Sequence, residues 1–271
     1  MPSKQAEGSV IVLSVAGYDP SSGAGVTADI KTIAAHGCYA ITCITALTVQ
    51  STQGVKRFET VDPRVITESL EELAADFSIS AVRIGMLGAS EVARAVAAFV
   101  RRHEFVNVVL DPVLKSSSGT DLISRDGVQI LKEKLLPLAL VVTPNTDEAS
   151  ALTGLPVTNV EQMQTAALQL RRLGARNVIV TGGHLDPPVD LLSMANTPEI
   201  KLFKGKKISG RSTHGTGCAF ATSLACNLAL GHSLPNATKA AKKYVTTALR
   251  RAVPLGKGRG PINHMAAVVT F

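Results

Sequence analysis

Short apolar runs alternate with amphipathic stretches along almost the whole chain, and this alternation constrains the fold more than any other feature. The runs at 9–16 and 106–110 are rich in Val, Ile and Leu and lack the alternation of a half-exposed strand. Similar runs occupy 39–49, 79–84, 138–142 and 178–180. Strands that are apolar on both sides belong to parallel sheets that helices cover on both faces. The sequence therefore predicts an α/β fold with a doubly wound, mostly parallel central sheet.

We expect a single domain over residues 9–271, because the chain shows no internal repeat and no low-complexity linker. Within it, the pattern predicts a loop at 51–54, a short hairpin within 190–209 and a mainly helical tail from Gly215. The polar stretch MPSKQAEG at 1–8 is expected to be disordered or extended. It lacks the basic-then-apolar layout of a signal peptide, which favours a cytoplasmic location.

Composition excludes several classes of partner. The formal net charge is +7, but aromatic residues make up only 4% and Trp is absent, so we expect no nucleic-acid binding. The uncharged stretch 32–55 is long enough for a membrane span, yet it contains His36 and two glutamines and divides into a helix end and a strand. We therefore expect no membrane contact. None of the four cysteines lies in a CxxC pair, which argues against a metal–thiolate site.

Polar residues follow the apolar runs at the points where strands should end. In open parallel sheets, ligands bind beyond the carboxyl ends of the strands. The residues that this rule brings together are Asp19, Gln50, Met86, Asp111, Asn145, Glu148 and the pair Gly182–Gly183. They predict a single site along one edge of the sheet.

The segment THGTGC, residues 213–218, precedes a helical run. Glycines at a helix start leave backbone N–H groups free, and the helix dipole adds partial positive charge there. We interpret Gly215, Thr216 and Gly217 as an anion hole for a phosphate, with an ordinary tight turn as the alternative. Cys218 lies where the same dipole is expected to lower the pKa of its thiol. Alternatively, Cys218 is a small buried residue that packs like Cys226.

Two acidic residues at neighbouring strand ends, Asp111 and Glu148, form a candidate Mg²⁺ site. This ion keeps much of its water and binds through one or two carboxylates together with phosphates. The alternative is that both are helix or turn caps, since Asp111 precedes a proline and Glu148 lies in a first helical turn.

Two further side chains could recognise a small polar molecule. Gln50 ends an apolar run, and its amide can donate and accept hydrogen bonds side by side, as an amino-substituted nitrogen ring requires. Asp29 lies on the first helix after a Gly-rich turn and could accept from a substrate hydroxyl or amine. A surface or capping position is the alternative for each.

Eight ordered motifs resemble the hydroxymethylpyrimidine/phosphomethylpyrimidine kinase family of thiamin biosynthesis, from about residue 10 to about residue 264. The motifs are AGYDPSSGAGVTADIKT, ITALTVQSTQGV, IGMLG, VVLDPVLKSSSG, TPNTDEA, TGGH, STHGTGC and GKGRGP. The family belongs to the ribokinase-like superfamily, so the resemblance implies a central, mostly parallel sheet flanked by helices. It also implies an enzyme that uses ATP and Mg²⁺ to phosphorylate hydroxymethylpyrimidine and then its monophosphate.

The resemblance assigns roles to residues of this chain. Cys218 matches the catalytic-base position, where the wider superfamily carries Asp, and residues 215–217 match the anion hole. Asp111 and Glu148 match positions that handle Mg²⁺ and phosphates. The matches to the pyrimidine pocket are Gly17, Asp29, Gln50 and Met86, and those to the nucleotide side are Asn145, Thr181, Gly183 and Lys257. Thr181 departs from the family, because many relatives carry Lys there as a phosphate contact.

Two other functions stay open at this point. A pyridoxal or pyridoxine kinase on the same fold would also phosphorylate a hydroxymethyl group on an aromatic nitrogen ring. A non-catalytic pyrimidine-binding sensor is the second alternative, against which the intact Asp111, Glu148 and HGTGC segment argue. The expected partners are a small pyrimidine substrate and ATP, and relatives suggest a homodimer or a larger homo-oligomer.

Overall fold

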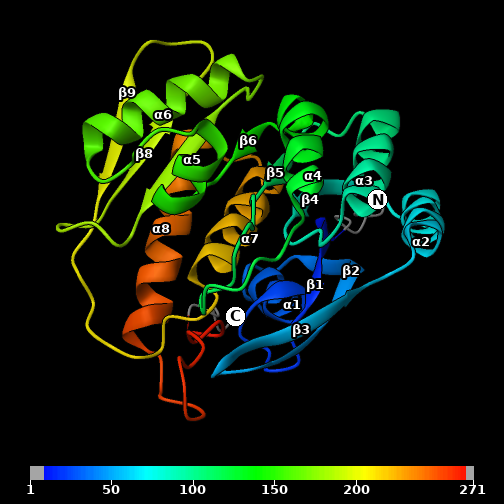
Figure 1. Cartoon of the computed structure of the whole chain (residues 1–271), viewed down its shortest axis with the longest axis horizontal. Coiled ribbons are helices and arrows are strands. Elements are labelled where there is room, and N and C mark those ends of the chain that lie inside the picture. The colour runs from blue at the N-terminus through cyan, green and yellow to red at the C-terminus, as the bar shows by residue number, and fades with distance from the viewer. Residues whose placement is uncertain (1–8, 267–271) are drawn as a thin grey trace, which may run out of the picture.

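The computed structural model describes residues 9–266, and one large sheet lies at its centre (Figure 1). The order across the sheet is β3-β2-β1-β4-β5-β6-β7-β8-β9. Neighbours from β2 to β7 are parallel, whereas β3, β8 and β9 each pair antiparallel at the two edges. The strands are β1 Ile11–Tyr18, β2 Tyr39–Ser51, β3 Gly54–Thr60, β4 Ile79–Ile84, β5 Val108–Leu110, β6 Val141–Val142, β7 Val178–Gly182, β8 Val189–Ser193 and β9 Ile200–Lys204.

Helices cover both faces of the sheet, which confirms the predicted fold class. They are α1 Gly25–Ala35, α2 Pro63–Asp76, α3 Ser90–His103, α4 Arg125–Ile130, α5 Thr146–Thr153, α6 Val160–Arg172, α7 Thr216–Ala229 and α8 Leu234–Arg250. Successive strand residues point to opposite faces. Val12 packs in the cluster with α1, α7 and α8, and the adjacent Leu13 packs in the cluster with α2 to α6. Every strand in the middle of the sheet must therefore be apolar on both sides.

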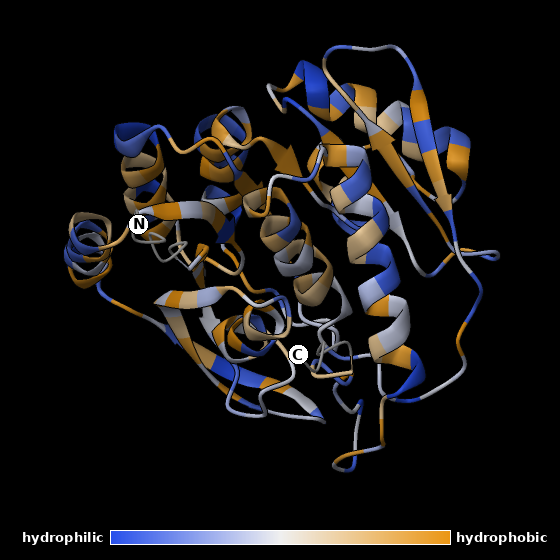
Figure 2. Cartoon of the chain, turned by 180° about the vertical axis from the view of Figure 1, so that it is seen from behind, coloured by the Kyte–Doolittle hydropathy of each residue, from blue (hydrophilic) through white to orange (hydrophobic). Residues whose placement is uncertain are grey.

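Hydropathy follows this layering (Figure 2). The short central strands β5 and β6 are hydrophobic throughout and fully buried, whereas α8 carries both colours because one of its sides faces solvent. None of the helices within residues 9–266 is long and apolar enough to cross a membrane. The expectation for residues 1–8 lies outside the described part of the chain.

The two edges differ in how well they could be predicted. The hairpin β8–β9 confirms the expectation for 190–209, and the tail from Gly215 is mainly helical as predicted. The turn between β2 and β3 falls within the expected loop at 51–54, but the strand β3 that follows it was not predicted. Residues of β3 are exposed or half-buried and include Lys56, Arg57 and Glu59. Only its apolar residues Val55 and Phe58 pack against a buried cluster, and they are three positions apart, so β3 lacks the alternation that signals a strand.

Candidate active site

A cleft of about 1030 Å³ opens where the parallel strands end. The hairpin β2–β3, the segment after β9 and the helices α7 and α8 contribute its walls. The predicted site residues that line the cleft are Gln50, Asn145, Thr181, Gly183, Thr216 and Gly217. The predicted site residues outside its lining are Gly17, Asp29, Met86, Asp111, Glu148, Gly215, Cys218 and Lys257.

The predicted anion hole lies at the first turn of α7. Gly215 is the N-terminal cap residue, with a φ of 84° that favours glycine, and no side chain caps the helix. A Cβ atom at Gly215 would lie 1.8 Å from the carbonyl oxygen of Gly23, so only glycine lets the two loops approach. Thr216 and Gly217, at the next two positions, face the cleft. The first N–H groups of a helix have no partner within the helix and can bind an anion.

Behind this turn lies a buried charge cluster that sequence reasoning missed. Arg83 of β4 is fully buried, and its Nη2 lies 2.5 Å from Oδ2 of Asp111, while Nη1 lies 3.1 Å from Oδ2 of Asp29. Gly85 makes room for the guanidinium, since a Cβ there would lie 2.0 Å from Nη1. A charged residue inside the apolar run 79–84 was the available signal. A buried arginine requires buried acids as partners.

Asp29, predicted to lie in the pyrimidine pocket, is fully buried, so the surface alternative for it is wrong. Its carboxylate has no exposed surface, accepts hydrogen bonds from Ser14 and Thr222 at 2.6 Å each, and pairs with Arg83. Both oxygens are therefore held by the protein. Asp29 therefore neutralises Arg83, and its contact with a substrate stays a prediction.

Cys218 lies half-buried in the first turn of α7, next to the same charges. Burial raises the pKa of its thiol to about 12, and Arg83 only partly offsets this effect because Asp111 and Asp29 act in the other direction. The expectation that the helix dipole lowers this pKa is therefore wrong. Loss of hydration and two nearby carboxylates outweigh the dipole of a single helix end.

Asp111 and Glu148 influence each other. Burial raises the pKa of Glu148 to about 8, with the Asp111 charge as the next largest cause, and burial also raises the pKa of Asp111. Glu148 completes a capping box, since its Oε2 accepts from the Asn145 N–H and its own N–H donates to Asn145 Oδ1. The capping alternative thus holds for Glu148. Its position beside a second acid nevertheless suits a divalent cation, which would relieve the repulsion.

Residues 9–266 contain no group of three or more His, Cys, Asp or Glu side chains that could hold a metal ion. The oxygen ligands available to a metal ion at this place are the carboxylates of Asp111 and Glu148, together with the phosphates of a bound nucleotide. Such a donor set fits Mg²⁺, which retains water and is often held by few protein ligands.

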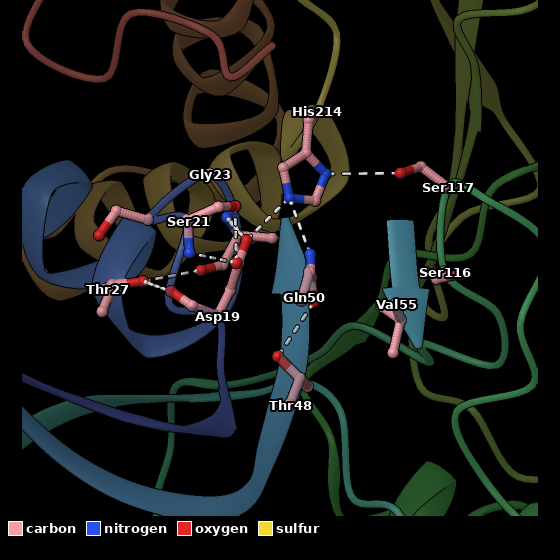
Figure 3. Close-up of polar contacts among 12 residues, drawn as sticks. Asp19, Ser21, Gly23, Thr27, Thr48, Gln50, Val55, Ser116, Ser117 and His214 are labelled. Atoms are coloured by element: carbon pink, nitrogen blue, oxygen red, sulfur yellow. Dashed lines mark hydrogen bonds and ion pairs between the residues drawn. The ribbon is translucent and has the colours of Figure 1, made fainter. Parts of the chain in front are cut away.

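The predicted pyrimidine residues Gly17 and Met86 lie against each other. A Cβ at Gly17 would lie 2.9 Å from Sδ of Met86. Gln50 lies 3.1 Å from Nε2 of His214, and that nitrogen lies 2.8 Å from Asp19 (Figure 3). Sequence reasoning gave His214 no role, although it lies in the THGTGC segment.

The nucleotide side contains more positive charge than predicted. Thr181, near the end of β7, forms a parallel bridge with Asn145, which follows β6. Lys257 is exposed, and its carbonyl oxygen accepts a hydrogen bond from Arg211 at 3.3 Å. The basic residues that line the cleft are Lys206, Lys207, Arg211, Lys242 and Arg259. Lys242 is paired with Asp190 at 2.6 Å and Lys207 with Asp186 at 3.4 Å, so Lys206, Arg211 and Arg259 are the better candidates to supply the positive charge that Thr181 lacks.

Comparison with known proteins identifies the family. A family model described as phosphomethylpyrimidine kinase matches residues 19–263. This chain belongs to the phosphomethylpyrimidine kinase family. It is 40% identical over 260 residues to a hydroxymethylpyrimidine/phosphomethylpyrimidine kinase of Haemophilus influenzae, covering 94% of this chain and 96% of the relative. It is 43% identical to the thiamine biosynthesis bifunctional protein of Geobacter sulfurreducens, of whose length it covers 52%, about half.

Solved structures agree with this phosphomethylpyrimidine kinase assignment and add a second relative. A phosphomethylpyrimidine kinase of Clostridium difficile 630 has a TM-score of 0.78 at 33% identity, covering 89% of this chain and 99% of that one. The ADP complex of Bacillus subtilis pyridoxal kinase has a TM-score of 0.87 at 31% identity, with 96% and 98% covered. The ribokinase-like architecture expected from the motifs is thereby confirmed.

Proposed function

We propose that this chain uses ATP and Mg²⁺ to phosphorylate 4-amino-5-hydroxymethyl-2-methylpyrimidine and then its monophosphate, the reactions for which its relatives in thiamin biosynthesis are named. The observation that carries the proposal is the uncapped first turn of α7, where Thr216 and Gly217 face a cleft of about 1030 Å³ and Cys218 follows directly. An anion hole beside a titratable side chain is suited to moving a phosphoryl group onto an alcohol.

Residues that line the cleft and the acidic residues behind it would have different roles in the reaction. The basic residues of the cleft and the pair Asn145 and Thr181 would bind the nucleotide phosphates. Asp111 and Glu148 would hold Mg²⁺, which when bound neutralises charge on the phosphates. The N–H groups of residues 215–217 would stabilise the transferring group.

The two reactions make different demands on the protein. The first acceptor is an alcohol, whose proton must leave as oxygen attacks phosphorus, and Cys218 is the side chain in the first turn of α7 placed to take it. The second acceptor is a phosphate that is already ionised at neutral pH. Alignment and charge stabilisation then suffice.

Pyridoxal phosphorylation is the second candidate, because structural relatives with TM-scores of 0.87 and 0.86 are pyridoxal kinases, one in complex with pyridoxal. Side-by-side turnover of hydroxymethylpyrimidine and pyridoxal tests the assignment. We expect the pyrimidine to have the higher kcat/KM and to be converted to the diphosphate, as product chromatography would show. A higher kcat/KM for pyridoxal, or no ATP consumption with the pyrimidine, would overturn the proposal.

A cytoplasmic location and a homodimer or larger homo-oligomer complete the proposal. The four free cysteines suit a reducing compartment. Native mass spectrometry of the full chain would give the oligomeric state.

A further inference from the structure

His214 contacts residues of three different loops or strands that surround the pyrimidine side of the cleft (Figure 3). Its Nε2 lies 2.8 Å from Oδ2 of Asp19 in the β1–α1 loop and 3.1 Å from the side-chain nitrogen of Gln50 on β2. Its Nδ1 lies 3.4 Å from Oγ of Ser117, which follows β5. The imidazole is nearly buried, and Gln50 faces the cleft.

Asp19 decides which nitrogen of His214 carries hydrogen. Oδ1 of Asp19 accepts from the N–H and hydroxyl of Ser21, and Oδ2 accepts from the N–H of Ala24 at 3.0 Å. These bonds leave both oxygens as acceptors. Burial acts to raise the pKa of Asp19, but the hydrogen bonds from His214 and Ser21 outweigh it and the pKa is lowered. An ionised carboxylate 2.8 Å from Nε2 requires a hydrogen on that nitrogen, whether the ring is neutral or charged.

Thr48 decides the other end of the Gln50 amide. Its hydroxyl donates to the carbonyl oxygen of Tyr18 at 2.9 Å and lies 3.2 Å from the amide of Gln50. A hydroxyl has one hydrogen. Because a backbone carbonyl can only accept, the Thr48 hydroxyl hydrogen is donated to the carbonyl oxygen of Tyr18. The Thr48 oxygen can then only accept a hydrogen bond from Gln50.

The hydrogen bonds at His214 and at Thr48 therefore favour the same orientation of the Gln50 amide. The oxygen and nitrogen of a glutamine amide are distinguished by their hydrogen bonds, not by shape. Nitrogen facing His214 would place an N–H group against another N–H group, whereas oxygen facing His214 can share the single Nε2 hydrogen with Asp19 and leaves no donor against a donor. We propose that His214, held by Asp19, fixes the Gln50 amide with its oxygen toward His214 and its NH₂ toward Thr48, and thereby determines which ring edge the site accepts.

The fixed amide has a definite pattern left for a ligand. One N–H and one carbonyl lone pair stay free, with the donor on the Thr48 side and the acceptor on the His214 side. A ring edge with an acceptor nitrogen beside an amino group matches this pattern. Pyridoxal has no amino group and no such edge. His214 is thus a positioning residue for specificity, and this part of the inference rests on the proposed function for its ligand.

Nuclear magnetic resonance of the ligand-free protein tests the orientation independently of any activity. Long-range ¹H–¹⁵N spectra of His214 should show hydrogen on Nε2, and the Gln50 side-chain NH₂ should give nuclear Overhauser effects to the methyl group of Thr48. Hydrogen on Nδ1 alone, or effects from the Gln50 NH₂ to the His214 ring instead, would overturn the proposal.

A double-mutant cycle tests the effect on specificity. We expect His214→Phe to raise the dissociation constant of 4-amino-5-hydroxymethyl-2-methylpyrimidine about tenfold by calorimetry, with the pyridoxal constant changed less than about twofold. In a Gln50→Ala background, His214→Phe should have little further effect, because it acts through Gln50. His232→Phe, at an exposed histidine between α7 and α8, is the control. Fully additive effects, or equal losses for both ligands, would refute the inference even where wild-type turnover supports the proposed function.

Discussion

Cys218 is expected to matter for one phosphorylation and much less for the other. Burial raises the pKa of its thiol to about 12, so at pH 8 only about one molecule in 10⁴ carries the thiolate. A thiol with a raised pKa becomes charged only as pH rises, and below its pKa the thiolate fraction grows about tenfold per pH unit. Phosphorylation of the alcohol should therefore accelerate from about pH 7 to 9, while phosphorylation of the monophosphate stays nearly constant.

Substitutions of Cys218 distinguish its role as a base from the contribution of the residues around it. Cys218→Ala should slow the alcohol step by about 10²–10⁴ and remove its pH dependence, because general-base catalysis contributes that much. The monophosphate step should fall far less. Cys218→Asp should keep a measurable fraction of the alcohol step, since a carboxylate can take the same proton.

Each step is assayed alone, with alcohol or monophosphate supplied and ADP release and product measured at saturating ATP and Mg²⁺. Cys226→Ala, a buried cysteine two turns further along α7, is the matched control. Equal losses in both steps would mean that Cys218 holds phosphate and takes no proton. A flat pH profile for the wild-type alcohol step would refute the thiolate as base. Unchanged rates of both steps in the Cys218→Ala variant would mean that Cys218 has only a packing role.

Three further predictions follow from the site. Asp111→Asn and Glu148→Gln should each lower Mg²⁺-dependent turnover at least about tenfold, or about 1.4 kcal/mol, and wild-type rates across a Mg²⁺ titration would favour the capping alternative. Gln50→Ala should raise KM for the pyrimidine more than it lowers kcat, and an unchanged KM in a folded variant would remove Gln50 from the pocket. Arg83→Met should cost about 3–5 kcal/mol in urea unfolding, because it leaves Asp29 and Asp111 buried without their cation; a loss below about 1 kcal/mol would contradict this.

Local pattern was enough to predict the layered fold. The apolar runs around Val12 and Val109 have no solvent-facing side, and this alone requires helices on both faces of a parallel sheet. The same reasoning placed Asn145 and Thr181 at strand ends, where the structure brings them together. It failed for β3, whose charged, exposed residues carry no apolar period.

The helix start at the glycines of the THGTGC segment could also be predicted, because a helix start and its free N–H groups depend on a few neighbouring residues. The surroundings of Asp29 and Cys218 could not be predicted from the sequence. Whether the Asp29 carboxylate, on α1, faces a ligand or an arginine depends on Arg83 of β4, which is distant along the chain. The direction of the Cys218 pKa depends on how much water packing removes and which charges it brings near.

The sequence by itself thus determined the sheet, the edge that carries the candidate site and the glycine turn at the start of α7, since each follows from patterns within a few residues. Only the tertiary structure decided the charge partners and which polar groups surround Gln50. His214 lies 195 positions from Asp19 and 164 from Gln50 along the chain, and no local pattern relates them. Hydrogen-bond geometry and the dielectric around a buried charge arise from contacts between distant segments, so they exist only once the chain has folded.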